Sequence, residues 1–241
     1  MTKRRIDSLM VERGLAESRA KAQALIMAGE VVVDDKANIK PGYLVDEAAI
    51  VNVTKPPPFV SRGGLKLDHA LDQFRIDVSG KVVVDIGAST GGFTDCLLKR
   101  GVNRVYAVDV GYGQLDYRLR QDPRVVVMER VNARYPFPLP EKVNLATLDL
   151  SFISVEKVIP SVANLLEIGG YLLVLIKPQF EARRREVGKG GVIKEPLKHA
   201  RILGRFLAWA VERSFRLGGL VASPILGASG NKEFFVLLKL T

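Results

Sequence analysis

The sequence lacks long apolar runs and paired cysteines, and each absence narrows the class of protein. No apolar run reaches the about 18 residues that a helix needs to cross a bilayer. The basic start Met1–Arg5 is not followed by the apolar core of a secretory signal. The single cysteine, Cys96, cannot form an internal disulfide, and with two histidines it cannot supply a usual zinc site. The sequence therefore predicts a cytoplasmic protein without stable membrane insertion and without a metal.

Positive charge is abundant: 36 Lys and Arg residues face 26 Asp and Glu residues, for a net charge of +10 and a pI near 9.8. This balance is typical of proteins that meet a polyanion, usually nucleic acid or an anionic membrane. The charge is concentrated in residues 177–205, where nine basic residues stand against three glutamates. The first 60 residues are almost balanced, so a contact with a polyanion there depends on the placement of a few side chains.

The first 60 residues form a pattern of their own, that of a small α+β module. Two helices are predicted, the first ending at Gly14 and the second opening at Ser18, a residue type that caps helix N-termini. Two short β patterns follow, at residues 31–33 and 49–53. The tract Pro56-Pro57-Pro58 is typical of a stiff spacer. The pattern predicts three parts, at residues 1–55, 56–61 and 62–241.

From residue 61 onward, apolar β-branched runs alternate with segments of helical length. Such runs are typical of buried parallel strands. The predicted strands are residues 82–86, 104–108, 125–128, 144–148, 171–176 and 234–238, with a weaker one at 220–224. The alternation predicts an α/β fold, a doubly wound Rossmann-like sheet that binds its ligand at the carboxyl ends of the strands.

The most informative segment is the glycine-rich loop Asp85–Thr94, which directly follows the first of these strands. Gly87, Gly91 and Gly92 permit a tight turn and a close approach of a ligand to the backbone. Ser89 stands where the dinucleotide fingerprint requires its second glycine, which argues against NAD. The pattern Asp-x-Gly-x-x-x-Gly-Gly instead resembles motif I of class I methyltransferases. The resemblance implies S-adenosyl-L-methionine as the cofactor.

A second acid, Asp109, ends the next strand, 24 residues after Asp85. An acid at this place accepts hydrogen bonds from ribose hydroxyls. Helix capping or turn chemistry is the alternative explanation for both acids, but two acids at equivalent strand ends favour a cofactor. The candidate cofactor-binding residues are Asp85, Gly87, Ala88, Ser89, Gly91, Gly92, Phe93, Asp109, Gly113, Gln114 and Asp149.

Four charged residues are candidates for the chemistry. Asp149 ends the fourth predicted strand and Lys177 the fifth, and a lysine at the end of a buried strand is uncommon unless it is paired or reactive. Lys66 begins a predicted helix before the first strand, and Glu233 precedes the last strand. Each of the four, taken singly, is also compatible with a solvated salt bridge at the edge of the sheet.

Lys66, Asp149, Lys177 and Glu233 resemble the Lys-Asp-Lys-Glu tetrad of FtsJ-like RNA ribose 2′-O-methyltransferases. Nearly the whole chain is similar to the hemolysin A (TlyA) family, which joins an S4 RNA-binding domain to an FtsJ-like domain. The resemblance implies seven mostly parallel strands, the last antiparallel. The best-known members of the family carry an Arg-x-Trp-type element between the domains, where this chain has Pro57-Pro58-Phe59-Val60. The segments that carry the resemblance are residues 14–22, 61–67, 85–93, 149–153 and 177–180.

The resemblance implies methyl transfer from S-adenosyl-L-methionine to a ribose 2′-hydroxyl, with a cytidine of ribosomal RNA or of ribosomal subunits as the target. The hydroxyl must lose its proton during the attack, and Lys177 is the candidate to orient or deprotonate it. A lysine can take the proton only if desolvation or a neighbouring charge, here that of Lys66, favours its neutral form. Asp149 and Glu233 are then expected to hold the two lysines in place.

Basic residues of the small module and of the loop after Lys177 are candidates for holding RNA. Ser18 and Arg19 open a predicted helix, where free backbone N–H groups favour phosphate. Phosphate contacts make binding fall steeply with salt, whereas a solvated surface charge, the alternative for each residue, does not. The candidate RNA-binding residues are Arg4, Arg5, Ser18, Arg19, Lys21, Arg62, Arg183, Arg184, Arg185 and Lys189.

Other functions stay open at this point. A membrane-active hemolysin is suggested by the name of the family, although the sequence has no long amphipathic run with a wide apolar face. A non-catalytic RNA-binding factor would use the same fold as a platform. Methylation of a base is disfavoured because the segment Asp149–Phe152 lacks the two prolines typical of base N-methylation, and Cys96 lies too early to act as a nucleophile on cytosine. The sequence carries no signal for an oligomeric state.

Overall fold

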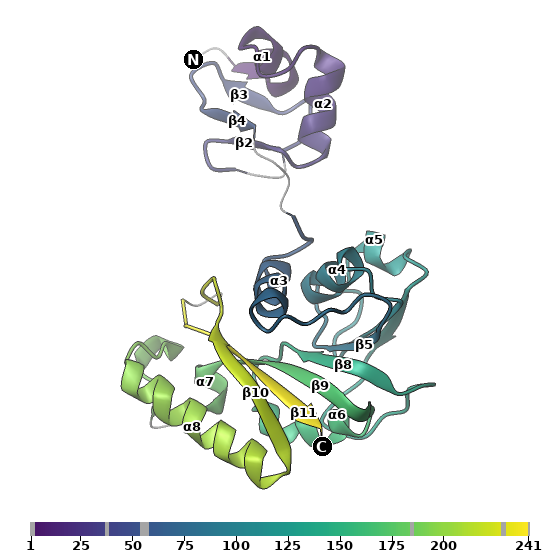
Figure 1. Cartoon of the computed structure of the whole chain (residues 1–241). Coiled ribbons are helices and arrows are strands. Elements are labelled where there is room, and N and C mark those ends of the chain that lie inside the picture. The colour runs from purple at the N-terminus through teal and green to yellow at the C-terminus, as the bar shows by residue number, and fades with distance from the viewer. Residues whose placement is uncertain (1–2, 37–38, 54–57, 184–185, 228–229, 241) are drawn as a thin grey trace. The chain divides into compact units, whose positions relative to one another are not determined.

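The protein divides into two compact units, Met1–Pro58 and Phe59–Thr241. Figure 1 shows the elements of each unit in a computed structural model. Phe59, expected in the spacer, is buried in the core of the second unit, where its ring packs against Gly64 and lies 5.1 Å from Nζ of Lys99. The structure describes residues 3–36, 39–53, 58–183, 186–227 and 230–240, so that the predicted spacer residues 56 and 57 lie outside it.

The N-terminal unit is built from two helices and two small antiparallel sheets. Ser18 caps α2 by accepting a hydrogen bond from the backbone N of Lys21 at 3.2 Å, which confirms the predicted start of that helix. Ile6, Met10 and Ile26 are buried between the helices and the strands. The elements are α1 (Ile6–Glu12) and α2 (Arg19–Met27), with β1 (Lys3–Arg5) paired to β3 (Leu44–Asp46) and β2 (Val31–Val33) paired to β4 (Val51–Val53).

The sequence pattern missed two strands of this unit, β1 and β3. The β1 residues Lys3–Arg5 are all charged and exposed, so hydrophobic alternation gives no signal there. The strand is held instead by its register with β3, in which Arg4 faces Val45. The predicted strand at residues 49–53 is shorter than expected, because the backbone N of Ala49 bonds to Asp46 O in a turn and β4 begins only at Val51.

The C-terminal unit is a seven-stranded sheet in the order β10-β11-β9-β8-β5-β6-β7. Neighbours from β9 to β7 are parallel, and β11 runs antiparallel to both β9 and β10. This order confirms the predicted Rossmann-like fold with its last strand antiparallel. The strands are β5 (Val82–Ile86), β6 (Arg104–Asp109), β7 (Val125–Glu129), β8 (Val143–Leu148), β9 (Leu166–Ile176), β10 (Phe215–Ala222) and β11 (Phe234–Leu240).

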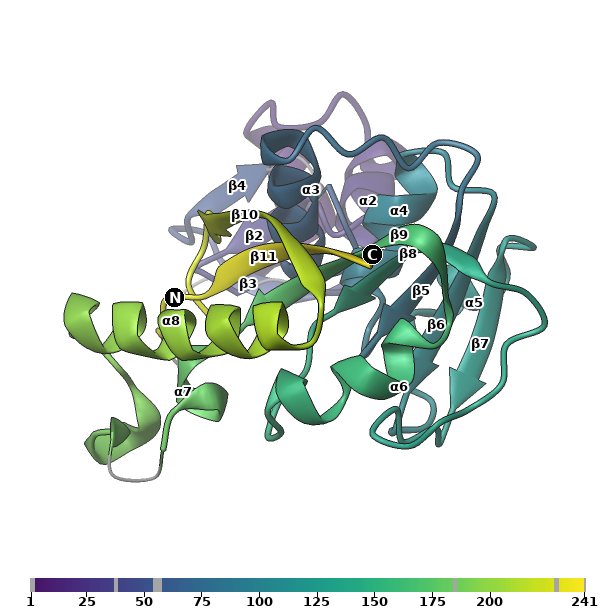
Figure 2. The same cartoon turned by 60° about the horizontal axis from the view of Figure 1, so that its bottom comes forward.

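Helices cover both faces of this sheet. Alternate residues of the central strands are buried in the two apolar layers between the sheet and these helices. Val84 and Ile86 of β5 pack on one side and Val83 on the other. Figure 2 shows α6 and α8 on one face and α3 and α4 on the other. The helices are α3 (Gly63–Gln73), α4 (Gly92–Lys99), α5 (Tyr117–Arg120), α6 (Ile159–Ala163), α7 (Pro178–Glu181) and α8 (Pro196–Glu212), with short 3-10 helices at η1 (Val155–Lys157) and η3 (Lys189–Gly191).

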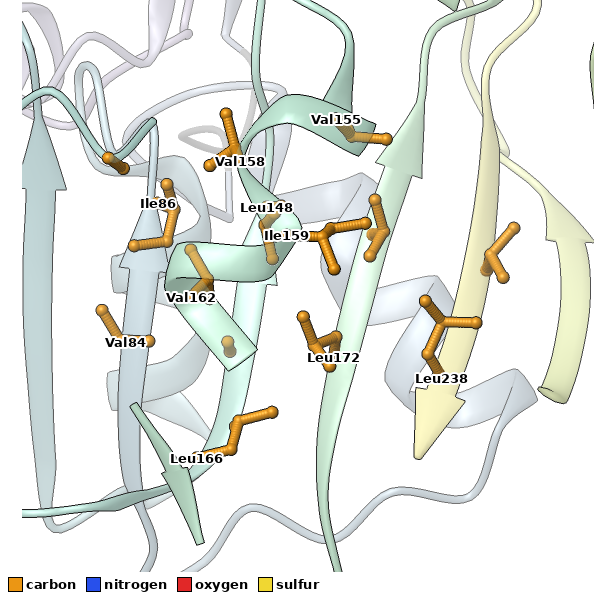
Figure 3. Packing of buried hydrophobic residues seen from close by; sticks show 14 of the residues in the cluster. Val84, Ile86, Leu148, Val155, Val158, Ile159, Val162, Leu166, Leu172 and Leu238 are labelled. Carbon is orange, nitrogen blue, oxygen red and sulfur yellow. The ribbon is translucent and has the colours of Figure 1, made fainter. Parts of the chain in front are cut away.

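The apolar layer under α6 fixes the position of the strand ends that carry the site. Figure 3 shows Ile159 and Val162 of α6 packed among Ile86, Leu148 and Leu172 of the strands beneath, and all five side chains are fully or almost fully buried. A close-packed interior of this kind leaves little freedom to its neighbours. The ends of β5 and β8 are therefore held at a constant separation. In the described part of the chain, no helix is long and apolar enough to cross a membrane.

Candidate active site

The glycine-rich loop turns sharply after β5 and lies against the end of β8. The backbone N–H groups of Gly87 and Ala88 both donate to Val108 O, at 2.8 and 3.1 Å. Gly87 has φ of +84°, and a Cβ there would lie 2.5 Å from the backbone oxygen of Asp149. Glycine is therefore required at this position, both for the left-handed backbone and for the close approach of β8. Ser89 also has a positive φ, +48°, and lies at the tip of the turn.

Asp109 holds the tip of this loop from the neighbouring strand. Its Oδ2 accepts a hydrogen bond from the backbone N of Ser89 at 2.8 Å, and its Oδ1 accepts one from Gly111 at 2.7 Å. The carboxylate is half-buried and lines a cavity, so each oxygen keeps a lone pair that a ligand can use. The placement agrees with an acid that receives ribose hydroxyls.

Asp85 lies beneath the loop, outside the walls of both cavities described below. It is fully buried, and its two oxygens accept hydrogen bonds from the hydroxyls of Thr94 at 2.7 Å and Thr147 at 2.9 Å. Burial raises the pKa of this carboxyl to about 7, against the opposing effect of the two hydroxyls. The contacts of Asp85 in the structure are with the framework of the loop, and a contact with the cofactor stays a prediction.

Two of the other expected cofactor residues, Gly91 and Gly113, also lie outside the walls of the two cavities. A Cβ on Gly91, whose φ is +95°, would clash with the side chain of Leu119, so the glycine allows α5 to pack closely. Gly113 donates its backbone N–H to Glu129 at 2.9 Å. Gly87, Ala88, Ser89, Gly92, Phe93, Asp109, Gln114 and Asp149 do line the cavities.

Two cavities meet at the carboxyl ends of the strands. The first, of about 480 Å³, extends over β6 and is lined by Val108, Asp109 and Gln114 together with the apolar side chains of Val131 and Leu150. The second, of about 610 Å³, extends towards α3 and α7. The two are contiguous, since their shared wall consists of Gly87, Ser89, Asp149, Ser151 and Phe152. We call them the cofactor cavity and the acceptor cavity.

All four members of the predicted tetrad line the acceptor cavity, and they form two ion pairs. Nζ of Lys66 lies 2.5 Å from Oε2 of Glu233, and both side chains are buried. Nζ of Lys177 lies 2.6 Å from Oδ1 of Asp149. Each pair joins residues that are distant in the sequence. The Lys66–Glu233 pair links α3 to the loop before β11, and the Lys177–Asp149 pair links the end of β9 to the end of β8.

The Lys177–Asp149 pair is the less completely bonded of the two. Lys177 donates a hydrogen bond to Ser151 Oγ at 3.0 Å. Its contact with Oδ1 of Asp149 is close but outside hydrogen-bond geometry, and that buried oxygen has no hydrogen-bond donor among the residues that the structure describes. The Lys177 ammonium compensates the charge of this oxygen, which can still accept a hydrogen bond from a ligand that brings a donor. A hydroxyl that enters the cavity can supply it.

Several residues of the acceptor cavity were not among the predicted site residues. Ser151 and Phe152 follow Asp149 within the segment 149–153 that carries the family resemblance. Their closeness to Asp149 in the sequence was therefore the available signal. Phe152 is 92% exposed with φ of +66°, and its ring lies 5.2 Å from that of Phe180. Asn231 is buried and joins Ile193 N to Gly191 O through its amide, a pairing that no local pattern predicts. The other missed residues include Ser61, Gly63, Thr90, Gln179 and Val187.

The candidate RNA-binding residues of the N-terminal unit are exposed, and the three arginines among them are paired with acids. Arg4 contacts Glu12 at 2.6 Å and also Glu47. Arg5 and Arg19 both bond to Asp7, at 2.8 and 3.2 Å, and Asp7 is fully buried. The guanidinium of Arg5 is the main cause of a pKa of Asp7 far below its usual range. Lys21 and the capping residue Ser18 are exposed beside them.

The remaining RNA candidates belong to the second unit. Arg62 is exposed and lines that cavity. Arg183 is exposed, and its backbone N donates to Glu186 Oε2 at 2.7 Å. Lys189 begins the 3-10 helix η3, while Arg184 and Arg185 lie outside the described residues. Across the described ranges, no cluster of three or more His, Cys, Asp or Glu residues is placed to hold a metal ion.

The sheet order, the glycine-rich loop and the paired tetrad at the strand ends define a Rossmann-like methyltransferase. Two family models match the chain: the FtsJ-like methyltransferase model over residues 59–240 and the S4 domain model over residues 4–51. The chain therefore belongs to the FtsJ-like methyltransferase family and carries an S4 domain at its N-terminal side. This confirms the resemblance seen in the motifs.

Individual relatives cover nearly the whole chain. YqxC from Bacillus subtilis (strain 168), provisionally named an rRNA methyltransferase, is 48% identical over 98% of this chain and 85% of its own. TlyA from Mycobacterium tuberculosis (strain ATCC 25618 / H37Rv), a 16S/23S rRNA (cytidine-2′-O)-methyltransferase, is 44% identical over 98% of this chain and 89% of its own. The solved structure of a provisionally named hemolysin from Streptococcus thermophilus is 42% identical, with a TM-score of 0.76 and coverage of 100% and 90%.

Proposed function

We propose that this protein transfers a methyl group from S-adenosyl-L-methionine to a ribose 2′-hydroxyl of ribosomal RNA, at a cytidine. The observation that carries the proposal is the acceptor cavity, in which the two lysine–carboxylate pairs lie beside the wall shared with the cofactor cavity. Two of the three relatives described above are named for rRNA as the substrate, and one of these two names specifies cytidine 2′-O-methylation. A ribosomal substrate would place the reaction in the cytoplasm.

The cofactor cavity fits S-adenosyl-L-methionine by the chemistry of its walls. Asp109 and Gln114 offer polar groups for a ribose, and Val108, Val131 and Leu150 offer apolar surface for an adenine ring. At Gly87 a Cβ would fill the space between the loop and β8. When bound, S-adenosyl-L-methionine supplies an electrophilic methyl group on a sulfonium.

The residues of the acceptor cavity orient the hydroxyl and handle its proton. As the new O–C bond forms and the methyl–sulfur bond breaks, the 2′-oxygen gives up its proton. The Lys177–Asp149 pair, with Nζ 2.6 Å from Oδ1, lies at the cavity wall to receive that proton. Lys66 and Glu233 form the second pair in the same cavity and favour a fixed position of the ribose. Correct placement of this kind contributes roughly 7–11 kcal/mol at best to such a reaction.

The test compares the wild-type protein with Lys177→Ala, using methyl-labelled S-adenosyl-L-methionine and separated ribosomal subunits, followed by digestion of the RNA to nucleosides. The wild type is expected to place label in 2′-O-methylcytidine. The variant should lose at least about 100-fold in rate while its affinity for S-adenosyl-L-methionine changes little, because Lys177 acts on the hydroxyl. Lys142→Ala is the matched control, since Lys142 bonds to Asn164 O beside the opposite end of β8.

Three outcomes separate the possibilities. Label in a 2′-O-methylnucleoside that disappears in Lys177→Ala supports the proposal. Label in a methylated base keeps the methyltransferase class but rules out the tetrad chemistry. Tight cofactor binding without label in any subunit or in naked RNA would contradict ribosomal RNA as the substrate.

A further inference from the structure

Gln179 is a polar residue of the acceptor cavity that the tetrad chemistry does not use. It lies in α7, two positions after Lys177, and it lines the same cavity as the four tetrad side chains. Its Oε1 is buried, and none of the residues that the structure describes donates a hydrogen bond to it. Buried side-chain acceptors in native proteins nearly always have a donor. A molecule that enters the cavity is the natural source of that donor.

The cavity walls indicate which molecule brings it. Gln179 lines the acceptor cavity and is not part of the wall of the cofactor cavity. With the cofactor held in the cofactor cavity, the donor at Gln179 comes from the acceptor nucleotide. Inside an RNA chain the 3′- and 5′-oxygens are esterified, so the ribose has a single donor, the 2′-hydroxyl, and its proton is held at the Lys177–Asp149 pair. The donors that remain are the N–H groups of the base.

We infer that Gln179 selects the acceptor base by accepting a hydrogen bond from its exocyclic amine through Oε1. The inference rests on the proposed function, under which the base is cytosine, whose N4 amine is its one N–H donor group. Uracil carries a carbonyl oxygen at the same place. Gln179 could meet that oxygen only by turning its amide, so that Nε2 takes the buried position of Oε1. With Oε1 placed as in the structure, two oxygens would face each other without a proton between them, and a site built for a hydrogen bond rejects such an analogue. Gln179 is thus a specificity-determining residue.

The experiment measures kcat/KM with ribosomal subunits that carry either cytidine or uridine at the methylated position. The wild type should prefer cytidine by roughly 10- to 100-fold. The reason is that a buried hydrogen bond forms with cytosine, whereas with uracil the buried oxygen is left without a donor. Gln179→Ala should reduce the preference to less than about threefold, because the acceptor oxygen is gone. Gln179→Glu keeps an acceptor and cannot turn an amide N–H towards uracil, so it should retain the preference for cytidine. Gln114→Ala, a change in the cofactor cavity, should weaken cofactor binding and leave the ratio unchanged.

The outcomes distinguish this inference from the proposed function. If the wild type yields no 2′-O-methylcytidine with natural subunits, the proposed function fails. If it does, but cytidine and uridine react equally well or the ratio survives in Gln179→Ala, the inference alone is wrong. If Gln179→Ala is inactive on both substrates, Gln179→Glu decides: activity with a cytidine preference supports base selection. Inactivity of both variants with intact cofactor binding would assign Gln179 to the reaction itself and overturn the inference.

Discussion

At the scale of single residues, Asp85 acts on the glycine-rich loop without lining a cavity. Its buried carboxylate receives the hydroxyls of Thr94 in α4 and Thr147 in β8. These bonds tie the end of β5 to the elements on both sides of it. The loop that begins at Gly87 therefore starts from a fixed position. The free energy that burial of the carboxyl group costs is offset by other interactions of the fold.

This burial predicts a pH-dependent stability. Because the pKa of Asp85 is raised by burial from 3.8 to about 7, the folded protein binds the proton more tightly than the unfolded chain, and the stabilisation present below about pH 4 is lost as the pH rises through 7. The difference between the two pKa values corresponds to a loss of roughly 4 kcal/mol in the free energy of unfolding, as an upper limit. The melting temperature of Asp85→Asn relative to wild type should therefore rise between about pH 5 and about pH 8.

Thermal unfolding across this pH range, monitored by circular dichroism, checks the prediction. Asp72→Asn is the control, because the Asp72 side chain is 64% exposed and its replacement should leave the difference from wild type nearly independent of pH. A constant difference for Asp85→Asn as well would show that Asp85 is charged in the folded protein throughout.

At the scale of elements, α7 connects the two strand ends that carry the Lys177–Asp149 pair. This single helical turn follows Lys177 directly and begins with Pro178, a residue suited to the first helical position. Its last residue, Glu181, reaches the loop after β8, where it accepts hydrogen bonds from Ser154 Oγ at 2.6 Å and from Val155 N at 3.0 Å. Burial raises the pKa of Glu181. The turn thus holds the loop after β9 against the loop after β8.

Glu181 is therefore expected to be a positioning residue. Glu181→Ala should lower kcat by about 10- to 100-fold, since a displacement of about 1 Å at the reacting atoms has an effect of that size. The affinity for S-adenosyl-L-methionine should change less than about threefold, because neither bond of Glu181 involves the cofactor cavity. Steady-state kinetics together with calorimetric cofactor titration separate the two quantities.

Glu181→Gln provides the decisive comparison. A glutamine can accept from Val155 N and donate to Ser154 Oγ, so it should restore most of the lost kcat. If the glutamine variant were as slow as the alanine variant, the charge of Glu181 and not its bonding would be what matters, and the positioning role would be wrong.

At the scale of the whole molecule, the net charge of +10 overstates how many basic groups are free of an acidic partner. Arg5 and Arg19 are held side by side on Asp7. In the basic segment 177–205, Arg205 bonds twice to Glu186, which lowers the pKa of that glutamate to about 2. Buried or half-buried acids of this kind orient the guanidinium groups at the surface. Phosphate binding then depends on placement more than on total charge.

The arrangement predicts a salt-dependent contribution of the Arg5–Arg19 pair to RNA binding. Replacing both with alanine should reduce the slope of log(kcat/KM) against log salt by about 1 to 2, as expected when one or two phosphate contacts are lost. The value of kcat at saturating RNA should stay unchanged, because neither arginine lines the acceptor cavity. The measurement is methyl transfer to ribosomal subunits over a series of salt concentrations.

Arg104→Ala is the matched control for this prediction. Arg104 is an exposed arginine paired with Glu141, and it begins β6, at the end of the strand opposite the cavities. Its replacement should leave the salt slope unchanged. An equal loss of slope in Arg104→Ala would mean that net charge, rather than the Asp7-held pair, governs the binding of RNA.

The sequence by itself determined the features that depend on neighbours along the chain. The strand runs, the turn after β5 and the capping serine of α2 follow from hydrophobic period, glycine spacing and side-chain type, all of which act within a few residues. The tetrad residues were also identified from the sequence, through strand ends and a motif resemblance. Even β11, seven residues of mostly apolar character, was recognised as a strand from this pattern.

The tertiary structure alone decided which of these residues meet. The pairing of Lys66 with Glu233 spans 167 positions, and the two lysines of the tetrad bind different acids because α3 and the loop before β11 converge on one side of the cavity. The burial of Asp85, the acids that hold Arg4 and Arg5, and the unpartnered oxygen of Gln179 likewise depend on contacts between distant segments. Local patterns carry no information on such contacts, because they arise from the packing of elements in space and not from the order of residues within one element.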